Sequence, residues 1–422
     1  MKKSLLVRGA RQLITMNGPS GPRRGESLRN LGIIEDGAVL ITGGVIASVG
    51  PTRRIENLAE ARDADEISAA GRVVMPGFVD SHTHLIAGSA RLEDHEMSIA
   101  GASEYEIERT GGGLFASIRK VRAASARSLE YQARRVIEGC IRHGTTTLEA
   151  KSGYGLDETT ELRILRTIAD LDQKPINVVP TYFGAHRTPP EYEQRTDEYL
   201  EWMCSHMIPK LRTRKLAKFA DVFCDPRAFS PEFSRKYLQT AKRLGLIPKI
   251  HAHGVGVQIA VEVDAASADG LSDATEADAN LLARSNTIAT MMPGLDFDGR
   301  MDRFAPARTL IERGAAVALA TGLQHVGSPT FNMQTVVALA CKYMKMTTAE
   351  AISAATINGA HALRMADRVG SIQFGRDADL IVLNVSDYRE ISYYFGVNLV
   401  GLTMRRGQII YKEADVLVPQ TD

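Results

Sequence analysis

The chain has 422 residues, of which 44% are hydrophobic and 24% are charged, a composition typical of a folded protein with a sizeable core. Basic and acidic residues balance, 51 against 50, for a formal net charge of +1. This balance excludes the basic footprint of a protein that binds nucleic acid or an anionic membrane. We therefore expect a small molecule as the partner.

The amino-terminal segment carries no export or membrane signal. Its first apolar run, Leu5-Leu6-Val7, is interrupted by Arg8 and is too short for the core of a signal peptide. No stretch approaches the roughly 20 apolar residues of a bilayer-spanning helix. The cysteines form no CxxC pair, so we interpret them as free thiols in a reducing compartment and expect a cytoplasmic protein. They are Cys140, Cys204, Cys224 and Cys341.

Short β-type runs occur at both ends of the chain. At the amino-terminal end they are separated by turn signals at Asp36-Gly37 and Gly43-Gly44 and by a predicted loop from Gly18 to Arg24. The two ends, residues 1–72 and 368–422, are predicted to build one small β domain. The runs lie at 5–7, 38–41, 45–50, 380–383 and 407–411.

Between these ends, apolar strand patterns alternate with helical patterns, which indicates parallel βα units. Eight units within residues 73–367 favour a closed (β/α)8 barrel, with an open doubly wound sheet as the alternative. The clearest helices run from Ser128 to His143, before Gly144, and from Asp157 to Leu171, each with a capping residue at its start. The strands are predicted near residues 78–84, 145–149, 176–182, 219–223, 248–253, 265–269, 286–291 and 316–321.

Two histidine pairs fall at the ends of predicted strands, where barrels of this type carry their chemistry. His82 and His84 close the first strand, and His251 and His253 close the fifth. Side chains two residues apart on a strand point to the same side, so each pair can converge on one cation. Imidazole suits zinc, iron and related metals. One such pair is as readily incidental, whereas two pairs predict a metal site.

Longer motifs extend over most of the chain. They are PGFVDSHTH (76–84), GGG (111–113), KSGYGL (151–156), GAH (184–186), DVFC (221–224), KIHA (249–252), ALAT (318–321) and SPT (328–330). These motifs resemble those of imidazolonepropionase, a family of the amidohydrolase superfamily. The resemblance implies an α/β fold, a (β/α)8 TIM barrel with a small β-sandwich domain from both chain ends, usually as a homodimer. It also implies hydrolysis of the imidazolone ring in histidine breakdown with one zinc or iron ion, bound by His82, His84 and His251.

The resemblance further places Arg91, Tyr154 and His186 where the family holds its substrate, and Gln324, after the eighth strand, is assigned with them. An Arg fork suits a carboxylate, so we predict a small carboxylated cyclic C–N compound as the substrate. Each of the first three residues also has a simpler interpretation. Arg91 would be a solvated surface residue, and Tyr154 and His186 would be packing residues.

Three positions depart from the family's pattern. Where the family has Ala-Thr-Asp after the eighth strand, with a carboxylate that binds the metal and moves a proton, this chain has Gly322 in place of the Asp. Gly254 replaces the substrate-contacting Glu of His-Ala-Asp-Glu on the fifth strand. Gly270 replaces the His of Ser-Ala-Asp-His on the sixth. Because an attacking water needs a base to collect its proton, we predict altered chemistry.

Two histidines are candidates for replacing the missing groups. His253 shares a strand face with His251, and His325 lies near the position of the absent aspartate. We predict catalytic roles for both, as a base or, for His253, a fourth ligand; the alternative is drift in a relaxed site. Asp269 is another carboxylate nearby, and its strand neighbours favour a structural role.

The sequence thus leaves three functions open. The first is a metal-dependent enzyme with altered chemistry, either a hydrolase or a lyase, isomerase or cyclase in which the metal polarises a carbonyl. The second is a catalytically inactive barrel that serves as a binding partner, which the three glycines favour. The third is ordinary imidazolonepropionase.

Overall fold

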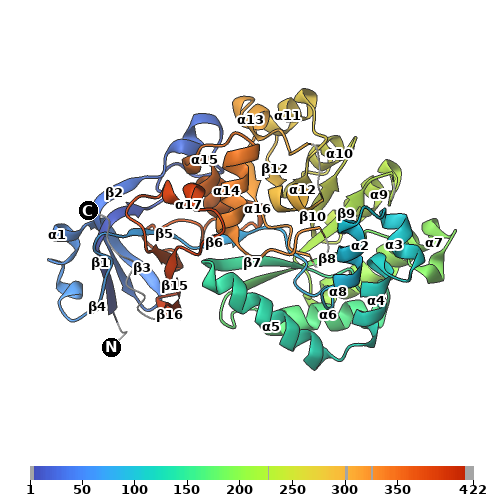
Figure 1. Ribbon diagram of the computed structural model, residues 1–422, viewed down its shortest axis with the longest axis horizontal. Coiled ribbons are helices and arrows are strands. Elements are labelled where there is room, and N and C mark those ends of the chain that lie inside the picture. The colour runs from blue at the N-terminus through green and yellow to red at the C-terminus, as the bar shows by residue number, and fades with distance from the viewer. Residues whose placement is uncertain (1–3, 227, 300–302, 325–326, 414–422) are drawn as a thin grey trace.

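A barrel of parallel strands lies beside a smaller sheet in this protein (Figure 1). The structure is a computed structural model that describes residues 4–226, 228–299, 303–324 and 327–413. The predicted fold class, a (β/α)8 barrel with a small β domain from both chain ends, is confirmed. Among the described residues, no helix combines the length and apolar character needed to cross a lipid bilayer.

The smaller sheet joins segments that are far apart in the sequence. Strand β5 is the junction, because it pairs in parallel with β1 and antiparallel with β14. The blue amino-terminal strands and the red carboxyl-terminal strands therefore lie side by side in Figure 1. Pairing carries this sheet as far as Pro76, and the domain limits at residues 72 and 368 stay a prediction. The strands are β1 (Ser4–Ile14), β2 (Ile33–Thr42), β3 (Val45–Pro51), β4 (Asp65–Ser68), β5 (Val73–Pro76), β14 (Leu380–Leu383), β15 (Val400–Arg405) and β16 (Gln408–Lys412).

The two turn signals near the amino terminus had different outcomes. Gly43 and Gly44 form the predicted turn between β2 and β3, and their φ angles of 61° and 83° are those that a tight hairpin turn requires. Asp36-Gly37 is not a turn, because both residues lie inside β2. A Cβ at position 37 would lie 2.4 Å from the Cβ of Leu13. Glycine is therefore needed there for the close approach of β2 to β1, a contact that local sequence does not reveal.

All eight predicted barrel strands are present, and they are hydrogen-bonded in chain order from β6 to β13. The ring closes between its first and last strands. The Thr321 N–H donates to Asp80 Oδ1 at 3.0 Å, and the His84 N–H donates to the Leu323 carbonyl at 2.7 Å. This closure excludes the doubly wound alternative. The strands are β6 (Phe78–Asp80), β7 (Thr145–Lys151), β8 (Asn177–Ala185), β9 (Phe219–Cys224), β10 (Ile247–Ala252), β11 (Ser267–Gly270), β12 (Ile288–Met291) and β13 (Val317–Leu319).

The helices form the outer layer, and the largest hydrophobic core fills the space between them and the strands. The α-helices are α1 (Thr52–Ile55), α2 (Leu92–Ile99), α3 (Glu104–Arg109), α4 (Gly113–Ala123), α5 (Ala126–Arg142), α6 (Glu158–Leu171), α7 (Thr196–Trp202), α8 (Ile208–Arg214), α9 (Pro231–Arg243), α10 (Gly256–Glu262), α11 (Glu276–Ala283), α12 (Pro293–Asp298), α13 (Ala307–Glu312), α14 (Met333–Tyr343), α15 (Thr348–Ser353), α16 (Gly359–Ala362) and α17 (Glu390–Tyr393). Single-turn π-helices, η4 (Met203–Met207) and η5 (Ala354–Asn358), extend α7 and α15.

Helix α5 begins earlier than the sequence predicted. Its N-cap is Ser125, whose Oγ accepts a hydrogen bond from the Ser128 N–H at 3.2 Å. The prediction that the helix starts at Ser128 was wrong, because two serines with the same capping chemistry lie one turn apart. Helix α6 has the predicted cap, with Asp157 Oδ1 accepting from the Thr160 N–H at 2.8 Å. Gly144 follows α5 with φ 92°, as expected of a residue that ends a helix.

The two serines provide a test of this cap. Ser125→Ala removes the oxygen that satisfies a free N–H of α5, so we expect it to lower the free energy of unfolding by about 1 kcal/mol. The matched control, Ser128→Ala, leaves the backbone N–H in place and is expected to change stability by less than about 0.5 kcal/mol. Urea denaturation of both variants measures the difference. A larger loss for Ser128→Ala would move the cap back to the predicted position.

Candidate metal centre

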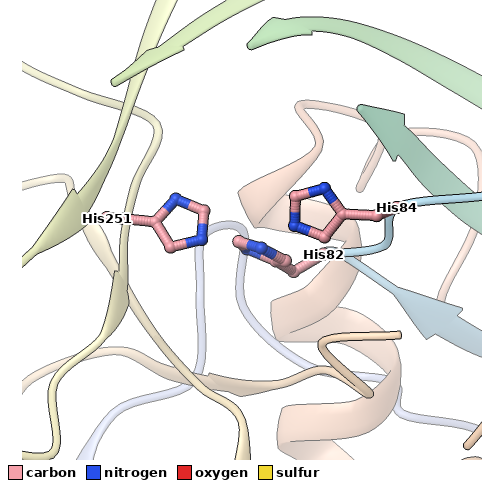
Figure 2. Close-up of side chains that lie close together, drawn as sticks. All are labelled: His82, His84 and His251. Carbon is pink, nitrogen blue, oxygen red and sulfur yellow. The ribbon is translucent and has the colours of Figure 1, made fainter. Parts of the chain in front are cut away.

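Three histidines converge at the carboxyl-terminal mouth of the barrel (Figure 2). His82 and His84 follow β6, and His251 lies near the end of β10. One nitrogen from each ring lies within 4.8 Å of the others. The rings of His82 and His251 meet edge to face, with centroids 4.4 Å apart. The structure thus brings together the three ligands named from the sequence, and their binding of an ion stays a prediction.

The protonation state of these rings suits a metal. His82 and His84 are buried, and burial lowers the pKa of both well below the usual value. The positive charge of Lys151 lowers the pKa of His82 further. Both rings are therefore neutral near pH 7, the form in which imidazole binds a metal. Three imidazoles with an open fourth position fit zinc or iron.

Carboxylates contact two of the three rings from behind. His82 Nδ1 lies 2.6 Å from Asp269 Oδ2, and His251 Nδ1 lies 3.3 Å from Asp221 Oδ2. The hydrogen bond to His82 selects the tautomer with the proton on Nδ1 and leaves Nε2 for the space between the rings. The Nδ1 atoms of His84 and His251 are both buried without a hydrogen-bond partner among the described residues, but only that of His251 has a carboxylate within ion-pair distance.

Beneath the histidines lies a set of five fully buried ionisable side chains, which we call the buried charge cluster. Lys151 Nζ lies 2.7 Å from Asp221 Oδ2 and 2.9 Å from Glu149 Oε2. Although burial opposes the charge, the neighbouring carboxylates raise the pKa of Lys151, and the same contact lowers the pKa of Asp221. Both groups are therefore charged at neutral pH. The members are Glu149, Lys151, Asp221, Lys249 and Asp269.

Sequence reasoning missed this cluster as a unit. Glu149 and Lys151 are two residues apart on β7, and Lys249 and His251 are two apart on β10. Side chains at this spacing lie on the same side of a strand. A charged residue two positions from a predicted ligand on the same strand could therefore have indicated the cluster. Asp269, for which the sequence favoured a structural role, lies at the centre of the cluster and contacts His82.

The predicted substrate residues adjoin the histidines on one side. The Tyr154 ring lies 5.9 Å from the His84 ring and 6.2 Å from the His186 ring, measured between centroids. His186 Nε2 contacts the Gly153 carbonyl at 2.5 Å, and burial lowers the pKa of His186 to about 4. Phe183, which the sequence did not single out, stacks on both His186 and His251.

Arg91 is nearly buried, with 11% of its side chain exposed, so it is not the solvated residue of the simpler interpretation. Its Nη1 lies 3.1 Å from Asp94 Oδ2. Nε is buried without a hydrogen-bond partner in the part of the chain that the structure describes. A buried guanidinium that one carboxylate holds and that has a spare donor is suited to an anionic ligand.

Of the residues assigned after the eighth strand, the structure describes one. Gln324 forms an isolated antiparallel bridge with Ser328, and its backbone N–H donates to the Ser328 carbonyl at 3.0 Å. Among the described residues, no hydrogen bond joins its side chain to the three histidines. Its assignment to the substrate stays a prediction. His325 lies outside the described residues.

His253 stands apart from the three-histidine group. Its Nδ1 lies 3.4 Å from Asp273 Oδ1, and 23% of its side chain is exposed. The glycine at position 270 leaves room for it, because a Cβ there would lie 3.9 Å from His253 Nε2. Gly322 has a φ of 63°, and a Cβ there would lie 3.1 Å from Met292 Sδ. A Cβ at Gly254 would meet nothing within 4 Å.

Comparisons with known proteins agree with this geometry. The model of the amidohydrolase family matches residues 73–410. Imidazolonepropionase of Geobacillus kaustophilus (strain HTA426) is 41% identical over 427 residues, which covers 99% of this chain and 100% of the relative. Imidazolonepropionase of Solibacter usitatus (strain Ellin6076) is 40% identical, with coverage of 98% and 100%.

Solved structures share the fold at lower identity. An adenosine deaminase from Xanthomonas campestris with bound zinc superposes with a TM-score of 0.70 at 19% identity, covering 97% of this chain and 93% of that one. Escherichia coli guanine deaminase superposes with a TM-score of 0.72 at 16% identity, covering 98% and 100%. At this identity the likeness establishes the barrel architecture.

Metal retention tests the three-histidine group directly. The protein, loaded with zinc or iron and freed of excess ion by gel filtration, is expected to hold about one ion per chain. His82→Ala, His84→Ala and His251→Ala each remove one ligand and should hold far less, as measured by inductively coupled plasma mass spectrometry. The control is His206→Ala, since His206 is half exposed and bonds Glu158 on the surface. Equal ion content in all five proteins would refute the site.

Proposed function

The chain belongs to the amidohydrolase family as an imidazolonepropionase-like member, and from this we propose that it is a metal-dependent enzyme acting on a small carboxylated cyclic C–N compound. One observation carries the proposal. The residues that would hold an ion and those that would hold a substrate are in contact, through the rings of His84, Tyr154 and His186.

Arg91 is the proposed anchor for the substrate carboxylate. Its buried Nε has no hydrogen-bond acceptor among the described residues, and a carboxylate presents two oxygens in the geometry that a guanidinium fork binds. Asp94 holds the side chain in place from one side, and Asp94 itself accepts a hydrogen bond from the Gly113 N–H at 2.9 Å. Tyr154, whose pKa burial raises to about 12, stays protonated and can donate to the bound substrate.

Zinc or iron on His82, His84 and His251 would supply Lewis acidity, which polarises a carbonyl and acidifies water. Position 322 is a glycine and offers no carboxylate to take the proton. We assign proton transfer to His253. Its Nδ1 lies 3.4 Å from Asp273 Oδ1, and 23% of its side chain is exposed, so the ring has a carboxylate partner and access to solvent. In ring hydrolysis, water would add across the C–N bond and His253 would carry its proton to the leaving nitrogen.

Ordinary imidazolonepropionase is the second candidate, supported by the 41% identity over nearly the whole chain. Reaction with a fresh imidazolone substrate, followed by loss of ring absorbance, distinguishes it from a reaction on another ring. A panel of carboxylated cyclic amides extends the assay to the altered chemistry. Failure of the ion-loaded protein to turn over any of these compounds would favour the inactive binding protein. The homodimer and the cytoplasmic location stay predictions.

Arg91→Met tests the carboxylate anchor. Because charge-assisted hydrogen bonds are lost, we expect KM for a carboxylated substrate to rise about 10- to 100-fold. A carboxamide analogue of the same substrate should be affected much less. The control is Arg134→Met, because Arg134 pairs with Glu130 on the outer helix α5. An equal loss with the carboxylate and the carboxamide would show that Arg91 does not bind the carboxylate.

His253→Ala tests the proton carrier. We expect kcat to fall by about 10²- to 10⁴-fold with little change in KM, because general acid–base assistance is lost while substrate contacts remain. The ion content should stay near that of the wild type. Unchanged kcat would remove His253 from the reaction, and loss of the ion would make it a ligand instead.

A further inference from the structure

The buried charge cluster is not explained by the stability of the barrel. Moving charged groups out of water carries a desolvation penalty, and apolar residues of similar volume often serve a protein core at least as well. Yet all five side chains are fully buried. We therefore look for the role of the buried charge cluster in the groups that its side chains contact.

What they contact is the metal centre. Asp269 Oδ2 lies 2.6 Å from His82 Nδ1, and Asp221 Oδ2 lies 3.3 Å from His251 Nδ1. The two carboxylates come from the two strands that flank β10, since Asp269 is on β11 and Asp221 is on β9. Each carboxylate thus contacts Nδ1 of one proposed ligand and can fix that ring's orientation and tautomer.

The lysines hold these carboxylates in place. Lys151 Nζ donates to Asp221 Oδ2 at 2.7 Å, and Lys249 Nζ lies 3.5 Å from Asp269 Oδ2. Lys249 also donates to Glu149 Oε1 at 2.8 Å and to the Ser81 carbonyl at 2.8 Å. Because Ser81 directly precedes His82, this last bond ties the cluster to the backbone that carries a ligand.

The charges of the cluster do not cancel. Its two lysines and three carboxylates have a formal sum of −1 when all are ionised. At the mouth of the barrel the three proposed ligands are imidazoles, which bring no negative charge, and Gly322 brings no carboxylate. A bound cation would therefore find its negative counter-charge below the imidazoles.

We propose that Asp269 and Asp221, held by Lys249 and Lys151, are positioning residues of the metal centre that supply, through His82 and His251, the negative charge missing at position 322. The inference rests on the proposed metal centre and adds to it the source of the ligands' orientation and charge. It also makes the three ligands unequal, because among the described residues carboxylates pair with His82 and His251 and none pairs with His84.

Asp269→Asn tests the proposal, because it keeps the side chain's volume and removes its charge. The affinity for zinc, measured by competition with a chromophoric chelator, is expected to fall about 10- to 100-fold. Asp221→Asn, with its longer contact, should lose less. The d–d absorption spectrum of the cobalt(II) form should shift in both variants, a change that loss of stability alone does not produce.

The matched control is Asp379→Asn. Asp379 is a buried carboxylate that accepts from the Arg406 N–H at 2.8 Å and from Asn177 Nδ2 at 3.3 Å, and Asn177 begins β8 at the end of the barrel opposite the mouth. This variant should keep the wild-type zinc affinity and cobalt spectrum, although its ion-free form is expected to melt at a lower temperature owing to the weakened bonds. If Asp269→Asn does not fold, Asp221→Asn decides the question.

The outcomes separate the two levels of the account. Wild-type protein that holds no zinc or cobalt would overturn the metal centre together with this inference. Wild-type protein that binds zinc while both Asp269→Asn and Asp221→Asn bind it equally well would overturn the inference alone. Equal losses of affinity in Asp379→Asn and Asp269→Asn would reduce Asp269 to a structural residue and would also overturn it.

Discussion

A lysine ammonium in the interior of a barrel needs a partner of opposite charge. The ion pairs of Lys151 constrain the part of the barrel that carries the three histidines. Its partners lie on two other positions of the barrel wall, Glu149 on β7 and Asp221 on β9. Removing one partner of a buried ion pair costs about 3–5 kcal/mol, because the other charge is left without compensation. The pair of Lys151 and Asp221 therefore links β7 to β9 in the barrel interior, and the histidines lie nearer to the mouth.

The centre lies at the ends of barrel strands. His251 is part of β10, and His82 and His84 directly follow β6, where the His84 N–H donates to the Leu323 carbonyl at 2.7 Å, so hydrogen bonds of the barrel hold their backbone. Closure of the ring passes through the same place, since the Gly322 N–H donates to the His82 carbonyl at 3.1 Å. Gly322, which stands where the family has a carboxylate, thus lies where the barrel closes, and it is hydrogen-bonded to the backbone of the proposed ligand His82.

Much of this could be predicted from the sequence. The eight barrel strands were identified because parallel buried strands are apolar runs separated by helical patterns, and the histidine pairs were identified by their two-residue spacing. The cap of α5 was misplaced because Ser125 and Ser128 have the same chemistry and the choice between them depends on the backbone. The contacts of Asp269 with His82 and of Phe183 with His251 join different strands, so they required the fold itself.

The central claim is that three imidazoles surround one ion at the mouth of the barrel. Anomalous scattering from a crystal of the zinc- or iron-loaded protein, collected on both sides of the metal's absorption edge, tests it most directly. The account predicts one strong peak within bonding distance of His82, His84 and His251. A peak bound elsewhere, or none from a protein shown to be folded and exposed to the ion, would contradict it.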